Sequence, residues 1–265
     1  GSFKVDITGN DVSLSNTGIY CQGYGYQPSY VFDALISGNN VHDNTGAGIS
    51  CYEEYVGQFY PEIRGNTVTT NGSDGISVTR NTGRNNTVAP VIILNTVTGN
   101  GSRGINCVAT APATILYNDV NANTGNGVDL TAGNGSSVHY NNLYNNSGGL
   151  ELNNGNGSSV NAQFNYWGAA AISEMEAGNN PKDISVIYDK FDNTGLGAVD
   201  YANWRSDSVT LPSPMQSAVT FPLDGTTFDA GTVNVRGIAV AEQGIDRVEI
   251  SINGGTWEPA VGGET

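Results

Sequence analysis

Short apolar phrases recur along the first two thirds of the chain, and each begins with an asparagine that is followed two residues later by an apolar residue. The asparagines are Asn10, Asn39, Asn66, Asn95, Asn118, Asn141 and Asn165, separated by 29, 27, 29, 23, 23 and 24 residues. Eight or nine residues after each of the first six comes a glycine followed by an aliphatic residue, from Gly18-Ile19 to Gly149-Leu150. Self-similarity with a period of roughly 20–30 residues predicts a solenoid of stacked repeats rather than one globular core.

Apolar and polar residues alternate within the glycine phrases, which predicts strands because neighbouring side chains of a strand point to opposite faces. The first inward column contains Ile19, Ile49, Ile76, Ile105, Val128 and Leu150, and the second contains Cys21, Cys51, Val78, Cys107, Leu130 and Leu152. The outward column between them contains Tyr20, Ser50, Ser77, Asn106, Asp129 and Glu151. Two apolar columns on either side of a polar one predict parallel strands with a buried face.

Three kinds of motif resemble the right-handed parallel β-helix proteins of the pectate-lyase-like superfamily, in their secreted bacterial form. They are the Asn-x-Val phrases, the Asn-Gly turns such as Asn71-Gly72 and Asn100-Gly101, and the closing Asn165-Tyr166-Trp167-Gly168. The resemblance covers roughly residues 5–204 and implies an all-β solenoid of short coils. That superfamily includes polysaccharide lyases, glycoside hydrolases, epimerases, phage tailspikes and adhesins, so the fold alone does not decide the function.

The composition changes near residue 205, where the Asn-Gly turns stop. We expect a β-helix over residues 1–205, a linker over 206–216 with the stiff run Leu211-Pro212-Ser213-Pro214, and a separate β module over 217–265. Segments of the module that alternate apolar and polar residues are Ala218–Pro222, Thr232–Ala241 and Arg247–Asn253. The run from Gly244 to Trp257 resembles bacterial immunoglobulin-like modules, which are sandwiches of about 100 residues. Because about half that length remains, we expect a partial, truncated module.

The chain carries a formal net charge of −15, with 25 acidic and 10 basic residues. Nucleic acid is therefore not an expected partner, since phosphate binding needs a basic surface. No stretch approaches the ~20 consecutive apolar residues of a membrane-spanning helix.

Acidic chains that are poor in lysine and rich in Gly, Asn and Thr are typical of secreted β proteins. We expect secretion or display at the cell surface, with the export signal outside this chain. The sequence does not predict an oligomeric state.

Stacking predicts structural roles for the repeated asparagines and for the cysteines. At a corner of the solenoid, each asparagine amide can bond the amides above and below it and the backbone of the turn. Cys21, Cys51 and Cys107 share one inward column and lack the paired spacing of a zinc site. We expect buried thiols, although Cys21 and Cys51 lie on successive coils about 4.8 Å apart, which also permits a disulfide.

A wall of three long loops is the first candidate for ligand binding. The excess length of the early repeats follows the second inward column, over residues 22–35, 52–62 and 79–91 of neighbouring coils. The predicted substrate-binding residues are Tyr24, Tyr26, Tyr52, Glu53, Glu54, Tyr55, Arg80 and Arg84. Aromatic rings suit stacking on sugars, and Glu and Arg suit bonds to hydroxyl groups or to a uronate. The alternative is that the tyrosines pack on one another as a lid over the flank of the solenoid.

Asp129 and Glu151 form a second candidate site, because the repeat alignment places them on adjacent coils with Cα atoms about 4.8 Å apart. Carboxyl groups ~5–5.5 Å apart suit retaining glycoside hydrolysis, so both are candidate catalytic residues. With Asn106 and Asn153 nearby, they are also candidate ligands for Ca²⁺, the one cofactor that the sequence suggests. The third interpretation is two solvated acids on a polar face.

Other charged residues give no catalytic motif. Arg103 precedes its glycine as Asp74 does one coil earlier, which predicts an ion pair along the solenoid. His42 and His139 have no serine or cysteine phrase nearby that would suggest a triad. Whether the chain is an enzyme is therefore left open, and a polysaccharide lyase or glycoside hydrolase is the class expected if it is catalytic.

The sequence favours an extracellular protein that binds or processes a polysaccharide through the long-loop wall. The alternative is a non-catalytic stalk or adhesin at the cell surface, in which the solenoid only displays its loops. The abundant Asn and Gly and the missing catalytic motifs favour this alternative.

Overall fold

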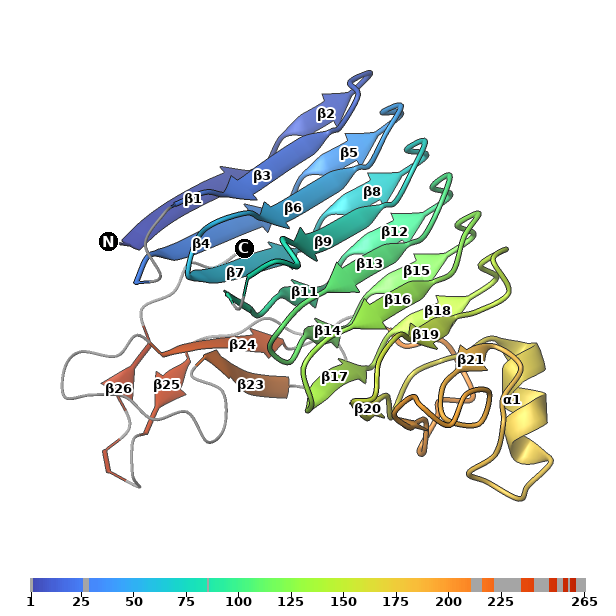
Figure 1. The fold of residues 1–265 in the computed structure, drawn as a ribbon. Coiled ribbons are helices and arrows are strands. Elements are labelled where there is room, and N and C mark those ends of the chain that lie inside the picture. The colour runs from blue at the N-terminus through green and yellow to red at the C-terminus, as the bar shows by residue number, and fades with distance from the viewer. Residues whose placement is uncertain are drawn as a thin grey trace. The chain divides into compact units, whose positions relative to one another are not determined.

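The computed structural model describes residues 2–25, 29–84, 86–210, 216–221, 235–240, 248–251, 255–256 and 258–260. The chain divides into two compact units, Gly1–Val209 and Thr210–Thr265. The first unit is a parallel β-helix of about six turns, in which each coil gives one strand to each of three sheets (Figure 1). The predicted all-β solenoid is confirmed.

The three sheets of the first unit stack their strands in chain order. Sheet A contains β1 (Ser2–Thr8), β4 (Val31–Ser37), β7 (Gln58–Arg64), β11 (Val91–Ile93), β14 (Thr114–Leu116), β17 (Ser136–His139), β20 (Val160–Asn161) and β22 (Val199–Asp200), with β10 (Thr87–Val88) beside β7. Sheet B contains β2 (Asp11–Ser13), β5 (Asn40–His42), β8 (Thr67–Thr69), β12 (Thr96–Thr98), β15 (Asp119–Asn121) and β18 (Asn142–Tyr144). Sheet C contains β3 (Ile19–Gly23), β6 (Ile49–Glu53), β9 (Ile76–Arg80), β13 (Ile105–Val108), β16 (Val128–Thr131), β19 (Leu152–Asn154) and β21 (Ile187–Tyr188).

The inward columns predicted from the glycine phrases form the core along sheet C. Ile49, Ile76 and Ile105 pair in register across successive coils, and all three are fully buried. The glycine before each strand lets sheet C approach sheet B closely: a Cβ at Gly48 would lie 2.5 Å from Cγ1 of Val68 in the next coil. Burial of these stacked apolar side chains is the main favourable contribution to folding.

The repeated asparagines form a hydrogen-bonded ladder between sheets A and B. Each donates from its backbone N–H and from Nδ2 to Oδ1 of the asparagine in the next coil, and for Asn95 both distances to Asn118 are 3.0 Å. Nδ2 also donates to a backbone carbonyl of the preceding coil, as from Asn118 to Ile92 at 2.9 Å. The ladder members from Asn39 to Asn165 are at most 2 % exposed. The predicted structural role of these asparagines is confirmed.

A second asparagine ladder, which the sequence analysis missed, runs between sheets B and C. Its members are Asn44, Asn71, Asn100, Asn123 and Asn146. Each lies five residues after a member of the first ladder, a fixed spacing that the sequence already contains. The residue before a ladder asparagine has a positive φ, for example 53° at Thr70 and 58° at Leu94. The bonds made by the following asparagine stabilise this left-handed turn in residues other than glycine.

Aromatic residues occupy the left-handed position before the first ladder in the later coils. The rings of Tyr117 and Tyr140 stack with centroids 5.1 Å apart and planes 8° apart, and those of Tyr140 and Phe164 stack at 5.1 Å and 7°. Such pairs contribute roughly 0.5–1.5 kcal/mol beyond area burial. The contact offsets a left-handed backbone conformation that disfavours residues other than glycine by roughly 1–2 kcal/mol.

A short helix that the sequence analysis did not predict, α1 (Ala169–Glu176), follows the last strands of the solenoid. It lies beyond β18 and β21 in Figure 1 and buries Ala171, Ile172 and Met175. The helix therefore covers apolar side chains at the C-terminal end of the stack, where β18 is the last strand of sheet B and the next coil adds a single bridge, between Asn142 and Tyr166.

The second unit contains two described strand pairs. β23 (Gln216–Phe221) lies antiparallel to β24 (Arg236–Val240), and β25 (Glu249–Ile250) lies antiparallel to β26 (Glu258–Pro259). The predicted Pro-rich linker segment over residues 211–214 lies outside the described residues. The immunoglobulin-like interpretation stays a prediction.

Val78→Asp is expected to unfold the β-helix or to lower its Tm sharply. Val78 is fully buried in register with Cys51 and Cys107, so a carboxylate there loses its hydration and gains no partner. Uncompensated buried charges destabilise a protein by about 3–5 kcal/mol. Thr79→Asp is the matched control, because Thr79 is half-buried and points outward on the same strand. Thermal melting followed by circular dichroism measures both, and an unchanged Tm for Val78→Asp would contradict the assigned inward face.

Asn118→Ala is expected to reduce the free energy of unfolding by about 2–5 kcal/mol. The substitution leaves the buried backbone N–H and Nδ2 of Asn95 without their acceptor, and each orphaned buried donor costs about 1–3 kcal/mol. Asn121→Ala is the control, because the half-buried Asn121 bonds only the outward-facing Thr98 and Asp119. Urea denaturation of both variants tests the ladder, and equal losses would show that it contributes no more than a surface amide.

Candidate functional site

A third inward column on sheet C contains charged residues where the other coils have small apolar ones. It lies two residues after the second inward column, and its members are Gly23, Glu53, Arg80, Ala109 and Ala132. Glycine or alanine fills this position on three coils, whereas the second and third coils place a carboxylate and a guanidinium there. Burial of charge is unfavourable unless partners compensate it. Two charged residues in this column therefore indicate a role other than packing.

Glu53 ends β6 and has no exposed surface. Its Oε1 accepts a hydrogen bond from Nδ2 of Asn86 at 2.6 Å, and its backbone carbonyl accepts one from the N–H of Asn81 at 2.7 Å. Oε2 is buried and has no hydrogen-bond partner among the described residues. Burial raises the pKa of Glu53, and the bonds from Asn86 and Asn81 and the charges of Arg80 and Arg84 oppose this shift. The carboxyl group therefore takes up a proton at a higher pH than an exposed glutamate does.

Arg80 ends β9, directly in register with Glu53. Its Nη1 donates to the backbone carbonyls of Asn81 at 3.4 Å and Arg84 at 3.2 Å, so the guanidinium holds residues 81–84 in place. Nε of Arg80 is buried and finds no acceptor in the described part of the chain. Within the described residues, Oε2 of Glu53, an acceptor, and Nε of Arg80, a donor, thus lie unpaired on neighbouring strands of sheet C.

Side chains from three successive coils form the outer rim of this site. The guanidinium carbon of Arg84 lies 4.7 Å from the ring centroid of Tyr55. The rings of Tyr55 and Tyr24 meet edge to face, with centroids 5.4 Å apart and planes 89° apart. The tyrosines therefore contact one another, as the lid interpretation predicts, yet Tyr24 is still 48 % exposed. This rim presents aromatic surface and a cation side by side.

A surface hollow of about 240 Å³ adjoins the charged column. It is lined by Asn86, Thr87, Thr110 and Ala111. Oγ1 of Thr110 accepts a hydrogen bond from the N–H of Val88 at 2.8 Å and donates to the carbonyl of Asn86 at 2.7 Å. Asn86 therefore connects the hollow to the buried Glu53. Sequence reasoning missed Asn86 and Thr110, because only the tertiary structure brings these loop residues to the end of the charged column.

The remaining residues predicted for the wall lie beside this group or outside the described residues. Tyr52 points outward from β6, in register with Gln22 and Thr79. The carboxylate of Glu54 accepts a hydrogen bond from Nε2 of Gln22 and so ties the second coil to the first. Tyr26 lies outside the described residues.

The prediction that residues 22–35, 52–62 and 79–91 are loops is wrong for part of their length. β4 and β7 have seven residues each, whereas β11 and β14 have three. Much of the excess length of the early repeats therefore widens sheet A, where parallel pairing satisfies the backbone hydrogen bonds. Phe59, within the second of these segments, lies on β7 and is fully buried in the core.

The predicted pairing of Asp129 with Glu151 is also wrong. Asp129 pairs with Asn153, and Leu152 rather than Leu150 continues the first inward column. Glu151 instead stands where the earlier coils have the glycine before the strand. The Gly149-Leu150 phrase that suggested the alignment lies two residues before the corresponding position of the strand. The turn between β18 and β19 is therefore longer than the repeat predicts.

Glu151 ends the second asparagine ladder. Its Oε1 accepts from the N–H of Asn146 at 3.2 Å and its Oε2 accepts from Nδ2 of Asn146 at 2.5 Å, so a carboxylate replaces the amide oxygen of a further asparagine. The side chain is almost fully buried, and burial raises the pKa of Glu151. Asp129 has other partners, Asn126 at 2.8 Å and Arg103 at 3.5 Å. The catalytic and calcium-binding roles suggested for the two acids stay predictions, without the pairing on which they rested.

The predicted ion pair between Arg103 and Asp74 is confirmed. Nε of Arg103 donates to Oδ1 of Asp74 at 2.9 Å, and Nη2 donates to Oδ2 at 2.8 Å. The bidentate geometry joins the third coil to the fourth on the outside of the solenoid.

The cysteines are buried free thiols, and Cys21 pairs in register with Cys51.

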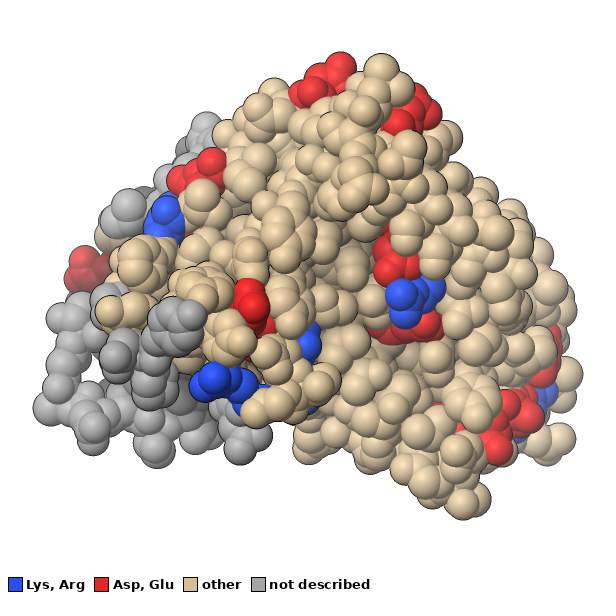
Figure 2. Space-filling view, turned by 45° about the horizontal axis from the view of Figure 1, so that its top comes forward, with Lys and Arg blue, Asp and Glu red and all other residues tan. Residues whose placement is uncertain are grey.

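Among the described residues, no group of three or more His, Cys, Asp and Glu side chains is placed to hold a metal ion. No helix in the described part of the chain is long and apolar enough to cross a membrane. The face shown in Figure 2 is mostly uncharged, with scattered acidic groups and few basic ones.

Residues 1–182 match the family described as the right-handed β-helix region. The chain belongs to the right-handed β-helix family. No match was found among curated proteins or among solved structures. The family match covers most of the first unit and supports the repeat architecture of this β-helix protein, and the resemblance to pectate-lyase-like proteins stays a prediction.

Glu53→Gln is expected to change how the stability of the β-helix protein depends on pH. Glutamine keeps an oxygen that can accept the bond from Asn86 but cannot ionise. The raised pKa of Glu53 in the folded state means that its stabilising contribution is present below the unfolded pKa of about 4.3 and is lost as the pH rises through the folded pKa. The Tm of the variant should therefore rise relative to that of the wild type as the pH increases from about 4.3 through the folded-state pKa of Glu53. A Tm difference that does not change with pH would contradict the raised pKa.

Proposed function

We propose that this β-helix protein acts outside the cell and binds a polysaccharide on the flank formed by its first three coils. The observation that carries the proposal is the placement of Glu53 and Arg80 in a column that is otherwise glycine and alanine. A solenoid that needs only packing at this position would use a small residue there, as the fourth and fifth coils do with Ala109 and Ala132. A buried carboxylate and a half-buried guanidinium at this position are explained if their charges act on a ligand or on the loops that hold it.

The surroundings of this pair suit a sugar polymer. Tyr24 and Tyr55 present aromatic rings for stacking against sugar rings, and Asn86, Thr87 and Thr110 supply polar groups for hydroxyls around the hollow. Because these residues come from successive coils, the binding surface is extended along the solenoid. An extended surface with several shallow contacts fits a chain of sugar units better than a compact ligand.

Processing of the polysaccharide is a further step that the same site would support. A buried glutamate with a raised pKa is suited to proton transfer, as lyases and hydrolases require. Proteins with this fold include both polysaccharide-processing enzymes and surface proteins. The rival function is a non-catalytic stalk or adhesin, which the two asparagine ladders favour because they stiffen the solenoid along its length.

Tyr24→Ala and Tyr55→Ala are each expected to weaken binding to a glycan by about threefold to tenfold. Removing one stacked ring forfeits roughly 0.5–1.5 kcal/mol of aromatic contact, and the Tm should hold because neither residue belongs to the core. Tyr144→Ala is the matched control, because Tyr144 also makes an edge-to-face pair, with Tyr166, but lies on sheet B. Retention on an array of neutral and acidic glycans measures the effect.

Arg84→Ala distinguishes the kinds of glycan on the same array. A guanidinium selects carboxylate or sulfate, so its loss should weaken binding of anionic glycans and leave neutral ones unaffected. If Tyr24→Ala and Tyr55→Ala lower the Tm and bind every glycan as the wild type does, the rim is a packing lid and the stalk function is favoured.

A further inference from the structure

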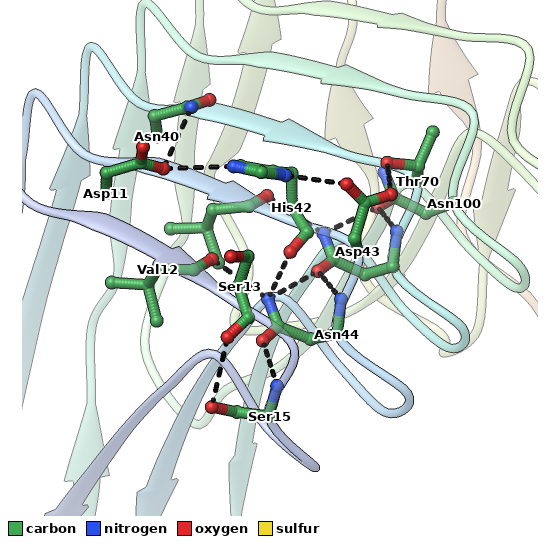
Figure 3. A network of polar contacts seen from close by, with 12 residues as sticks. Asp11, Val12, Ser13, Ser15, Asn40, His42, Asp43, Asn44, Thr70 and Asn100 are labelled. Atoms are coloured by element: carbon green, nitrogen blue, oxygen red, sulfur yellow. Dashed lines mark hydrogen bonds and ion pairs between the residues drawn. The ribbon is translucent and has the colours of Figure 1, made fainter.

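A separate polar cluster lies on sheet B, where a histidine stands between two carboxylates (Figure 3). Nε2 of His42 lies 2.9 Å from Oδ1 of Asp11, and Nδ1 lies 2.7 Å from Oδ2 of Asp43. Oγ1 of Thr70 donates to Oδ1 of Asp43 at 2.8 Å. Nδ2 of Asn40 donates to the same oxygen of Asp11 at 3.1 Å. Each ring nitrogen of His42 therefore faces its own carboxylate.

The cluster joins three successive coils. Asp11 begins β2 in the first coil, His42 ends β5 in the second, and Thr70 directly follows β8 in the third. The contacts from Asp11 through His42 and Asp43 to Thr70 thus run across the strands, along the axis of the solenoid. We propose that Asp11, His42, Asp43 and Thr70 form a pH-controlled clamp that fastens the first coil to the second and third while the imidazole is charged.

The chemistry of the contacts makes the clamp depend on the proton. A carboxylate only accepts hydrogen bonds, so both ring nitrogens must donate for both contacts to form. The imidazolium has two N–H groups and the neutral ring has one. Asp43 and then Asp11 raise the pKa of His42 above its ordinary value. The in-register neighbours of His42 on the adjacent strands are Ser13 and Thr69, which carry no charge.

The first coil is the part of the solenoid that such a clamp would affect most. β2 has three residues and pairs with β5 alone among the described strands. Its central Val12 is only half-buried, whereas the equivalent Val41 of the second coil is fully buried. Ser15 occupies the ladder position of the first coil and donates only its backbone N–H to Asn44, at 3.0 Å. β1 and β3 pair with the second coil over seven and five residues, so β2 and the turn after it, with fewer core and ladder contacts, are the segment of the first coil with the least other support against local opening.

The sign of the effect follows from the raised pKa of His42. Opening of the first coil breaks the contact of His42 with Asp11 and keeps the contact with Asp43, its neighbour in the chain. While both carboxylates are ionised, the stabilisation of the first coil is therefore complete below the pKa that His42 has in the opened coil, and it is lost as the pH rises through the folded-state pKa. Each unit by which the contact with Asp11 raises the pKa of His42 corresponds to a tenfold change in the equilibrium between the closed and the opened coil.

Proton NMR titration of the imidazole signals is the first test. The chain has only two histidines, and burial lowers the pKa of His139, which gives an internal reference. We expect the His42 signal to titrate above about 6.5. Asp43→Asn and Asp11→Asn should each lower the pKa of His42. A His42 signal that titrates at or below the ordinary value, or that Asp11→Asn does not move, would overturn the proposal.

Hydrogen exchange then tests whether the charge fastens the first coil. Two backbone N–H groups that bond between the first and second coils serve as reporters. The N–H of Asn40 donates to the carbonyl of Asn10, and the N–H of Ser15 donates to Oδ1 of Asn44. The wild type and His42→Gln are compared at the same pH, because glutamine can bond one neighbour but cannot carry the charge. We expect the wild type to exchange more slowly at low pH and the two proteins to converge as the pH rises through the pKa of His42.

The N–H of Asn118, which donates to Oδ1 of Asn141 in the middle of the first ladder, is the control amide. Its exchange should be the same in the wild type and in His42→Gln at every pH. A difference between the two proteins at Asn40 and Ser15 that is constant with pH would show a fixed structural contact and would refute a pH-controlled clamp.

Discussion

Hydrogen bonding between successive coils is the constraint on which the rest of this structure depends. A solenoid turns its chain sharply several times in each coil, and every turn exposes backbone donors and acceptors that need partners once they are buried. Here asparagine satisfies them at two corners, since one amide can bond the coil above, the coil below and the turn itself. Because these corners repeat, the strands between them stay in register, and the first two inward columns of sheet C form apolar stacks as far as Val128 and Leu130.

That register also explains why the charged pair in the third column is informative. On a solenoid the same position is sampled once in every coil, so the other coils show what packing alone requires. Small residues meet that requirement on three coils, and Glu53 and Arg80 depart from it on two of the three coils that carry the rim. Glu53 accepts a bond from Asn86, and Arg80 donates to the carbonyl of Arg84, so the two charged residues of the column also hold residues beside the exposed rim in place.

Carboxylates end or interrupt the regular amide pattern at several places, with different consequences. Glu151 accepts both bonds that a further ladder asparagine would accept and so closes the second ladder near the C-terminal end. Asp74 fixes Arg103 on the outside of the third and fourth coils. Asp11 and Asp43 face a histidine instead, where the partner's charge depends on pH. The partner thus decides the role of each acid: beside an amide or an arginine it forms a fixed contact, and beside a histidine it forms a contact that changes with pH.

The sequence by itself determined the repeat, the inward and outward faces of sheet C through Leu130, the first asparagine ladder and the Arg103–Asp74 pair, because each of these depends on local alternation and on a nearly constant spacing. Only the tertiary structure decided the register between β16 and β19, the extension of the early loops into seven-residue strands, and the hydrogen bond of Glu53 with Asn86. The turn before β19 is longer than in the other repeats and still contains a glycine phrase. Counting along the chain therefore could not reveal that Glu151 takes the place of the glycine before the strand. Asn86 and Thr110 reach the site through loops on different coils, and which loop residues meet depends on packing between coils, not on any spacing within one.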